Sequence, residues 1–170
     1  IVASLVGSEM CIRDSDIIMC ESMSSIFEGS NASKVAKEFS ERVWLSWTNR
    51  GHQPDQLPST EALSKAVDFS IEADVECTLI NCSHADMASN SIKELKRASR
   101  FGIFANSSKF KEVDLSIATK DVDAIHHLNS EKISAKEYAM IALSWVKEGA
   151  FVVGGCCGTT VEHTREIRLL

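Results

Sequence analysis

Three cysteines of this chain follow two apolar, strand-like segments, and their type and spacing point to metal chemistry. Cys82 ends one segment, and Cys156 and Cys157 follow the other within the run GGCCG at 154–158. Thiolates bind zinc strongly, and three protein ligands with one open position describe a catalytic zinc site. A substrate thiol in that position loses its proton. Because thiolate ligands keep the metal electron-rich, the pattern favours alkylation of a thiol over activation of water.

Other interpretations of the same cysteines remain open. An isolated Cys-Cys pair is usually buried packing, and the shared position at strand ends is what favours a site. A non-catalytic zinc or thiol protein is one alternative. A redox protein that uses Cys156 and Cys157 is another. Counting free thiols with and without a chelator separates them, because bound zinc shields thiols and a disulfide removes them.

Composition and charge exclude several classes of partner. The chain has 170 residues, a net charge of −6 and no run of Lys and Arg, which argues against nucleic acid and an anionic membrane surface. No apolar stretch approaches the roughly 18 residues that cross a bilayer. The six cysteines occur in a chain that is neither short nor loop-rich and shows no complete secretory signal. We therefore expect reduced thiols and a cytoplasmic protein.

The first fifteen residues differ from the rest. The segment 1–15, IVASLVGSEMCIRDS, resembles a translated library adaptor and continues no pattern that follows. It is interpreted as a non-native segment, so Cys11 receives no role and the domain is predicted to cover 16–170.

Strand-like and helical segments alternate from Asp16 onward. Ser59 is expected to cap one helix, and Ser134 with Glu137 and Thr159 with Glu162 resemble capping boxes. The segment 106–132 is long and polar. The predicted strands are 16–20, 42–48, 75–82, 102–105 and 150–154, and the predicted helices are 31–40, 59–70, 86–100, 134–149 and one that opens at 159.

This alternation specifies an α/β fold with a parallel sheet and helices outside it. Five βα units are too few for a complete eight-stranded barrel, and they match the C-terminal part of a (β/α)8 TIM barrel without about its first three strands. The alternative, an open doubly wound sheet, is disfavoured because no glycine-rich phosphate loop follows the first strand. In a barrel the cysteines would meet at the carboxyl ends of the strands, where active sites form.

The run GGCCGTT at 154–160, together with Asn81-Cys82, resembles the homocysteine S-methyltransferase family. The resemblance extends from about Asp16 to the end of the chain. It implies a zinc-dependent (β/α)8 barrel whose metal ligands are Cys82, Cys156 and Cys157. It also implies homocysteine and a methyl donor as partners, with methionine as product.

The resemblance gives further residues a role. Glu21 would contact the amino group of homocysteine, with Ser22 where the family has Thr, and Asn106 would be a second substrate-binding residue. The compact ending favours a sulfonium donor, S-methylmethionine or S-adenosylmethionine. A betaine-dependent module or a module linked to cobalamin and methyltetrahydrofolate is the alternative. An inactive zinc-binding fragment is a further one, since the Asp-Gly-Gly segment of the family's first strand has no counterpart here.

The remaining chemically active side chains are predicted to have structural roles. His84 is interpreted as a loop residue, with a group that supports the metal ligands as the alternative, and the pair His126-His127 is also interpreted as part of a loop. Packing is the interpretation for the other side chains in apolar segments, namely Cys20, Cys77, Trp44, Trp47 and Trp145.

Overall fold

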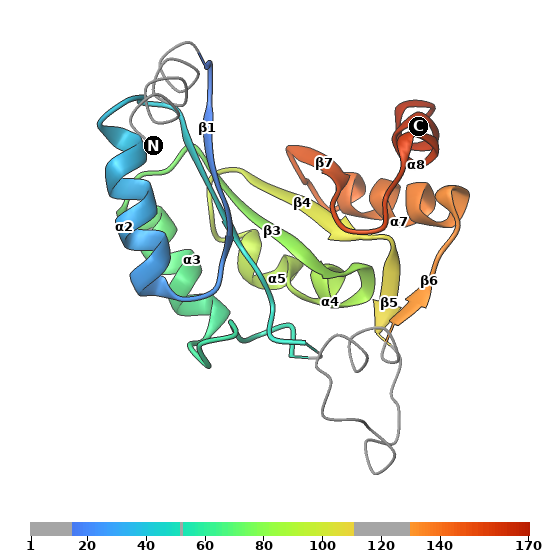
Figure 1. The fold of residues 1–170 in the computed structure, drawn as a ribbon, viewed down its shortest axis with the longest axis horizontal. Helices are drawn as coiled ribbons and strands as arrows, with labels where there is room; N and C mark the ends of the chain where they lie inside the picture. The colour runs from blue at the N-terminus through green and yellow to red at the C-terminus, as the bar shows by residue number, and fades with distance from the viewer. Residues whose placement is uncertain (1–14, 52, 111–129) are drawn as a thin grey trace, which may run out of the picture.

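The computed structural model describes residues 15–51, 53–110 and 130–170 as an α/β structure (Figure 1). The strands are β1 (Ile18–Met23), β2 (Val43–Trp47), β3 (Cys77–His84), β4 (Phe101–Asn106), β5 (Ser108–Phe110), β6 (Ser130–Lys132) and β7 (Val152–Gly155). The helices are α2 (Ile26–Lys37), α3 (Leu63–Glu72), α4 (Ala85–Asn90), α5 (Ile92–Leu95), α7 (Ala135–Lys147) and α8 (Val161–Arg168).

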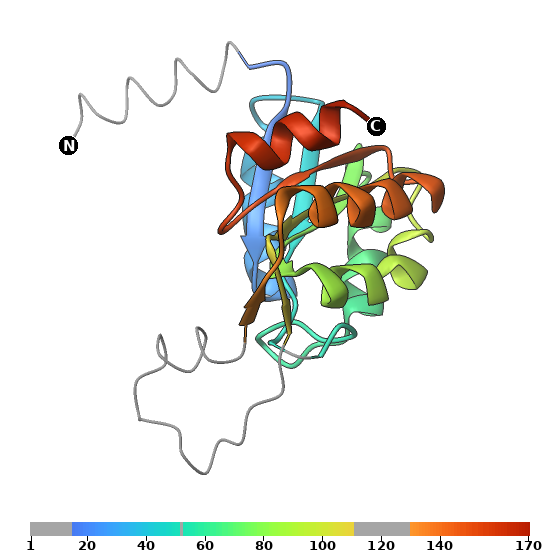
Figure 2. The same ribbon diagram turned by 90° about the vertical axis from the view of Figure 1, so that its right-hand side faces the viewer.

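The main sheet has the order β1-β2-β3-β4-β7, and every neighbouring pair is parallel. Its order in space is therefore its order along the chain. Right-handed crossovers that always advance in one direction place their helices on one face, which Figures 1 and 2 show. A doubly wound sheet would reverse direction, so the structure excludes that alternative and confirms the predicted barrel-type arrangement.

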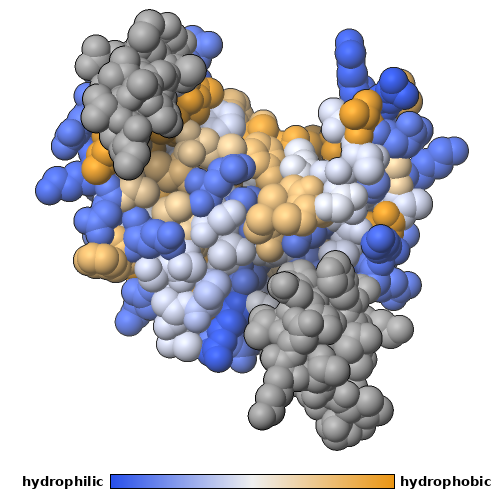
Figure 3. Space-filling view, in the orientation of Figure 1, coloured by the Kyte–Doolittle hydropathy of each residue, from blue (hydrophilic) through white to orange (hydrophobic). Residues whose placement is uncertain are grey.

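The two faces of the sheet are packed differently. Val43, Leu45 and Trp47 point to the helices and are fully buried, and Trp47 Nε1 donates to Ser70 Oγ at 3.0 Å. Trp44 lies on the opposite face, where it is only half-buried and packs edge-to-face against a phenyl ring. An apolar band crosses the strand region in Figure 3. Packing is thus confirmed for Trp47 and for the buried Trp145 of α7, and Trp44 also packs, although on the face of the sheet opposite to the helices.

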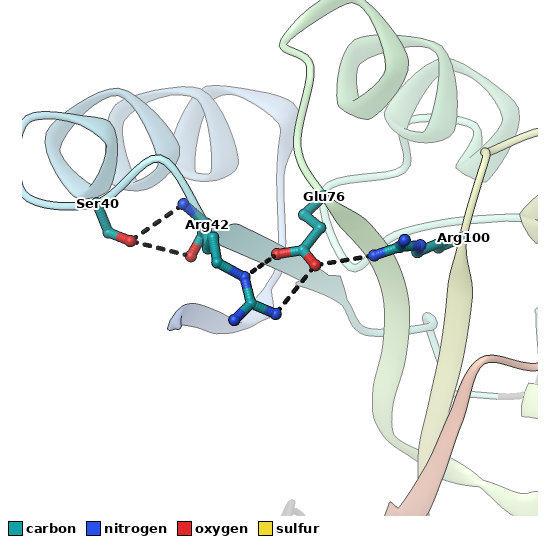
Figure 4. A network of polar contacts seen from close by, with 4 residues as sticks. All are labelled: Ser40, Arg42, Glu76 and Arg100. Atoms are coloured by element: carbon teal, nitrogen blue, oxygen red, sulfur yellow. Dashed lines mark hydrogen bonds and ion pairs between the residues drawn. The ribbon is translucent and has the colours of Figure 1, made fainter. Parts of the chain in front are cut away.

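An ionic network holds the amino ends of three neighbouring strands together (Figure 4). Arg42 donates to both carboxylate oxygens of Glu76, at 2.9 and 3.1 Å, and Arg100 donates to the same carboxylate at 2.9 Å. The Arg42 guanidinium holds the pKa of Glu76 below its ordinary value. These contacts fix the starts of β2, β3 and β4 at the edge opposite to the cysteines.

Several predicted helix limits were wrong for local reasons. α2 begins at Ile26 instead of near residue 31, because Ser25 caps it by accepting a hydrogen bond from the Glu28 N–H. α3 has Ala62, not Ser59, as its N-cap. The predicted helix 86–100 is interrupted at Ser91, whose hydroxyl bonds to carbonyls instead of pointing to solvent.

The capping boxes were also only partly right. Ser134 accepts from the Glu137 N–H as predicted, whereas the Glu137 carboxylate forms an ion pair with Lys109. α8 is capped by Thr160, whose backbone N–H donates to His163 Nδ1 at 3.2 Å. The predicted box was therefore one residue too early.

The polar stretch after β4 contains regular structure that the sequence did not indicate. β5 and β6 form an antiparallel pair, and residues 111–129 between them lie outside the described residues. Among the described residues, no helix combines the length and the hydropathy that a membrane crossing requires.

Candidate metal centre

The structure brings Cys82, Cys156 and Cys157 together at the carboxyl edge of the sheet. The Sγ of Cys82 lies 2.8 Å from that of Cys156 and 3.7 Å from that of Cys157, and all three sulfurs lie within 4.8 Å of one another. β3 and β7 both pair with β4, so their ends lie two strands apart. Cys156 and Cys157 close this gap from the loop after β7.

Cys82 is directed toward the loop by an irregularity in β3. Its φ of 50° lies in the left-handed region, which non-glycine residues seldom occupy. The register between β3 and β4 shifts between Asn81 and His84, as in a β-bulge. Bulges near active sites re-aim side chains, and here the irregularity coincides with the cysteine.

The loop after β7 is fixed to β4 by backbone hydrogen bonds. The Cys156 N–H donates to the Ala105 carbonyl at 2.8 Å, and the Cys157 N–H donates to Asn106 Oδ1 at 3.0 Å. Ser107 N–H in turn donates to the Cys157 carbonyl at 3.0 Å. Both cysteines are therefore held beside the end of β4, within reach of β3.

Close packing around the loop depends on glycine and on a buried tyrosine. A Cβ on Gly155 would lie 2.4 to 2.7 Å from Thr159 side-chain atoms, so a larger residue at this position would displace Thr159. Gly158 has a φ of 77°, which glycine adopts without strain. Tyr138 Oη lies 2.7 Å from the Ala105 carbonyl oxygen and 2.8 Å from that of Gly154, so the two carbonyls share its single O–H donor. It thereby joins β4 and β7 where the loop begins.

The three sulfurs fit a tetrahedral thiolate site. Zn–S bonds of about 2.3 Å imply sulfurs roughly 3.8 Å apart. The separation of 3.7 Å between Cys82 and Cys157 meets this value, and the 2.8 Å between Cys82 and Cys156 would have to widen by about 1 Å. That shorter distance is longer than the roughly 2.05 Å of a disulfide, and the described cysteines are free thiols. The cluster could therefore hold a metal ion.

Burial makes the Cys82 thiol hard to ionise without a metal. Burial, and then the contact with Cys156, raise the pKa of Cys82 to about 12, while the Ser22 hydroxyl acts in the opposite direction. A cation among the three sulfurs would reverse this preference, because metal ligands bind as thiolates.

The other predicted site residues lie around this edge. Glu21 is exposed in β1, directly before Ser22. Asn106 is buried at the end of β4, where its Oδ1 supports Cys157. A cavity of about 250 Å³ is lined by Thr48, Asn49, Gly51, Cys82, Ser83, His84 and Asn106. A larger hollow of about 590 Å³ lies between α4, α5 and α7, away from the thiols.

His84 was wrongly interpreted as a loop residue. It ends β3 and is 6% exposed, and its Nδ1 lies 2.9 Å from Ser108 Oγ. Cys20 and Cys77 are buried within strands, as predicted. Cys11 and the pair His126-His127 lie outside the described residues.

Sequence reasoning missed the part played by Asn81 and its partners. Asn81 was noted only as the neighbour of Cys82, yet its buried side chain bonds to Ser22 and Ser46. The available signal was an amide in a strand with a largely apolar first half, because a buried amide needs partners.

Comparisons with known proteins agree with this architecture. The family model for homocysteine S-methyltransferase matches residues 8–170. Its match begins inside the segment 1–15, whose separate origin stays a prediction. Homocysteine S-methyltransferase YbgG of Bacillus subtilis (strain 168) is 25% identical over 155 residues, which cover 89% of this chain and 45% of YbgG.

Solved structures of the homocysteine methyltransferase MmuM from Escherichia coli share the fold. The apo form has a TM-score of 0.63 at 18% identity, over 91% of this chain and 50% of MmuM. The metallated form has a TM-score of 0.64 at 18% identity, over 98% and 48%. The chain thus spans about half the length of the relatives it matches. Because the family model covers almost all of its residues, the chain belongs to the homocysteine S-methyltransferase family.

Proposed function

We propose that this chain takes part in the transfer of a methyl group from a sulfonium donor to the sulfur of homocysteine, giving methionine. The observation that carries the proposal is the convergence of three thiols within 4.8 Å of one another at the carboxyl edge of a parallel sheet. Membership of the family supports the reaction class.

The resident metal in this proposal is zinc, held by Cys82, Cys156 and Cys157. The donor set supports zinc, since three thiolates suit a soft, tetrahedral ion and leave one position for a substrate sulfur. When bound, zinc supplies the Lewis acidity that allows a substrate thiol to lose its proton at neutral pH. The homologous MmuM has a metallated form.

In this proposal, Glu21 and Asn106 bind and orient the substrate. Glu21 is exposed in β1, directly before Ser22, and its carboxylate has the charge to receive an ammonium group. Asn106 uses Oδ1 for the Cys157 N–H, which leaves its amide N–H groups beside the cavity that Cys82 also lines. We assign that amide a supporting contact to the substrate.

The transfer itself is a displacement at carbon. The homocysteine sulfur forms a bond to the donor methyl carbon as the bond between that carbon and the sulfonium sulfur breaks. The donor leaves as a neutral thioether, and the thiol proton is released to solvent. A zinc ion held by Cys82, Cys156 and Cys157 would favour loss of this proton, so no side chain would need to act as general base, and the protein would contribute positioning and electrostatics.

The proposal also includes a methyl donor and a cellular compartment. S-methylmethionine or S-adenosylmethionine is the preferred donor, and betaine or methyltetrahydrofolate through cobalamin is the alternative. We place the protein in the cytoplasm, where cysteine thiols stay reduced. A zinc-binding chain without activity is the second candidate, since the three thiols alone can hold the ion.

The proposal is tested with metal content and methyl transfer measured on the same preparation. We expect about one zinc per chain and methionine formation from homocysteine and S-methylmethionine. Cys156→Ser should abolish both. Cys20→Ser, which alters a thiol buried within β1, is the matched control and should retain zinc. Zinc without methyl transfer supports the binding candidate, and wild-type protein without zinc contradicts both.

The redox alternative predicts a different result. If Cys156 and Cys157 cycle between thiol and disulfide, oxidised protein loses two reactive thiols whether or not a chelator is present. In the metal proposal the chelator increases the number of reactive thiols, because it removes the ion that shields them.

A further inference from the structure

The side chain of Asn81 joins the carboxyl ends of three neighbouring strands. Its Oδ1 accepts hydrogen bonds from the Ser22 backbone N–H at 3.0 Å and from the Ser46 hydroxyl at 2.6 Å. Its Nδ2 donates to the Ser22 hydroxyl oxygen at 2.7 Å. Asn81 is 1% exposed, so these bonds form where an unpaired amide would be costly. The ends of β1, β2 and β3 are therefore held in one arrangement.

Asn81 connects two residues that share an uncommon backbone conformation. Ser22 has a φ of 60°, and Cys82, which directly follows Asn81, has a φ of 50°. The registers of β1 and β3 with their neighbours both shift at these positions. Left-handed non-glycine residues persist where surrounding contacts over-determine them, and they gather at ligand sites. The paired bonds between Asn81 and Ser22 are such contacts.

Both residues adjoin groups to which the proposed function assigns roles. Glu21 directly precedes Ser22, and Cys82 is one of the three thiols. Homocysteine carries its amino group and its sulfur at opposite ends of a short carbon chain. A substrate that uses both groups therefore needs a fixed distance between the Glu21 carboxylate and the sulfur cluster.

We propose that Asn81 is a positioning residue that holds the Glu21 end of β1 at a fixed place relative to Cys82. Its bonds to Ser22 allow the amino group and the sulfur of one substrate molecule to reach their partners together. Its bond to Ser46 only anchors the amide to β2, which carries neither partner. This inference rests on the proposed function, because it assumes that Glu21 receives the amino group.

The test compares two substitutions that each remove one bond to Asn81. Asn81→Ala would remove all three bonds at once, and unfolding would then obscure the result. Ser22→Ala removes the bond at 2.7 Å between β1 and β3 and keeps the backbone bond. Ser46→Ala is the matched control, because it removes a bond of similar length to β2. Each protein is loaded with Co²⁺, whose thiolate absorption bands report an intact metal site.

Two thiols are titrated into the Co²⁺-loaded proteins, and the change in absorption gives each dissociation constant. Homocysteine has the amino group, and 4-mercaptobutanoate is the same molecule without it. We expect wild-type protein to bind homocysteine more tightly. Ser22→Ala should reduce this preference about tenfold, because a displaced Glu21 would lose its charged hydrogen bond to the substrate's amino group. Ser46→Ala should leave the preference unchanged.

The outcomes separate this inference from the proposed function. If wild-type protein prefers homocysteine and Ser22→Ala keeps the full preference, Asn81 does not position Glu21 and the inference is wrong. Equal reductions in Ser22→Ala and Ser46→Ala would show a merely structural role and would also overturn it. Wild-type protein that binds Co²⁺ but does not distinguish the two thiols would overturn the assignment of Glu21, and this inference with it.

Discussion

Gly155→Ala perturbs the metal centre without altering any thiol. A Cβ at this position would lie 2.4 Å from Thr159 Cγ2, 2.6 Å from Oγ1 and 2.7 Å from Cβ. Side chains require at least 3.0 Å, so Thr159 must move by about 0.6 Å. Threonine is stiff at χ1, and its hydroxyl is bonded to the Cys156 carbonyl at 2.6 Å. The displacement is therefore expected to reach Cys156.

A displacement of this size should affect zinc affinity more than the free energy of unfolding. Metal–sulfur distances tolerate only about 0.2 Å, so we expect zinc affinity to fall by about 10- to 100-fold. The metal-free protein should lose about 1 kcal/mol of unfolding free energy, the low end for overpacking, because the loop is exposed and can yield.

Competition with a chromophoric chelator measures the affinity, and urea denaturation with the metal removed measures the stability. Thr159→Gly removes all three clashing atoms, so the double variant should bind zinc more tightly than Gly155→Ala alone. Unchanged zinc affinity in Gly155→Ala, or no rescue in the double variant, would refute the argument that this contact shapes the site.

Three further predictions concern the scaffold. Tyr138→Phe removes a buried hydroxyl that bonds to two carbonyls and should lower the free energy of unfolding by about 1 kcal/mol in urea denaturation. Ser25→Ala removes the cap of α2 and should cost about 1 kcal/mol in the same assay, with lower helicity by circular dichroism. The pKa of Glu76 is lowered on folding, so its ionised form stabilises the protein above pH 4.5, its ordinary pKa, and this contribution is lost as the pH falls further. The stability difference between wild-type and Glu76→Gln should therefore shrink below pH 4.5, and a constant difference would contradict the role of the network.

The sheet was predictable because its pattern is local. Each buried strand is a short apolar segment bounded by turn-forming residues, and the five main strands were expected within about three residues of their observed limits. Helix starts were less predictable, since Ser25, Ser59 and Thr159 all have a capping residue's chemistry. The sequence could not show that Thr159 is not the cap of α8. Its hydroxyl donates to the Cys156 carbonyl instead, and only the folded loop creates this contact.

The meeting of the three cysteines was predictable from the sequence, whereas the hydrogen bonds that support the site were not. Cysteines at strand ends could be expected to meet, because parallel strands end at one edge. The bonds of Asn81 to Ser22 and Ser46 could not be expected, since they join residues 59 and 35 positions apart and depend on strand register. Among the glycines of the run at 154–158, only Gly158 has a positive φ, whereas Gly155 is needed for close approach to Thr159.

The amino edge of the sheet carries contacts that stabilise the fold, and the carboxyl edge carries the candidate site. At the amino edge, Arg42, Glu76 and Arg100 are linked by ion pairs. At the carboxyl edge, Ser22 and Cys82 occupy left-handed conformations. Such conformations cost free energy and survive where they serve a site. Because separate contacts hold the two edges, substitutions in the ionic network should change stability and leave the spacing of the three sulfurs intact.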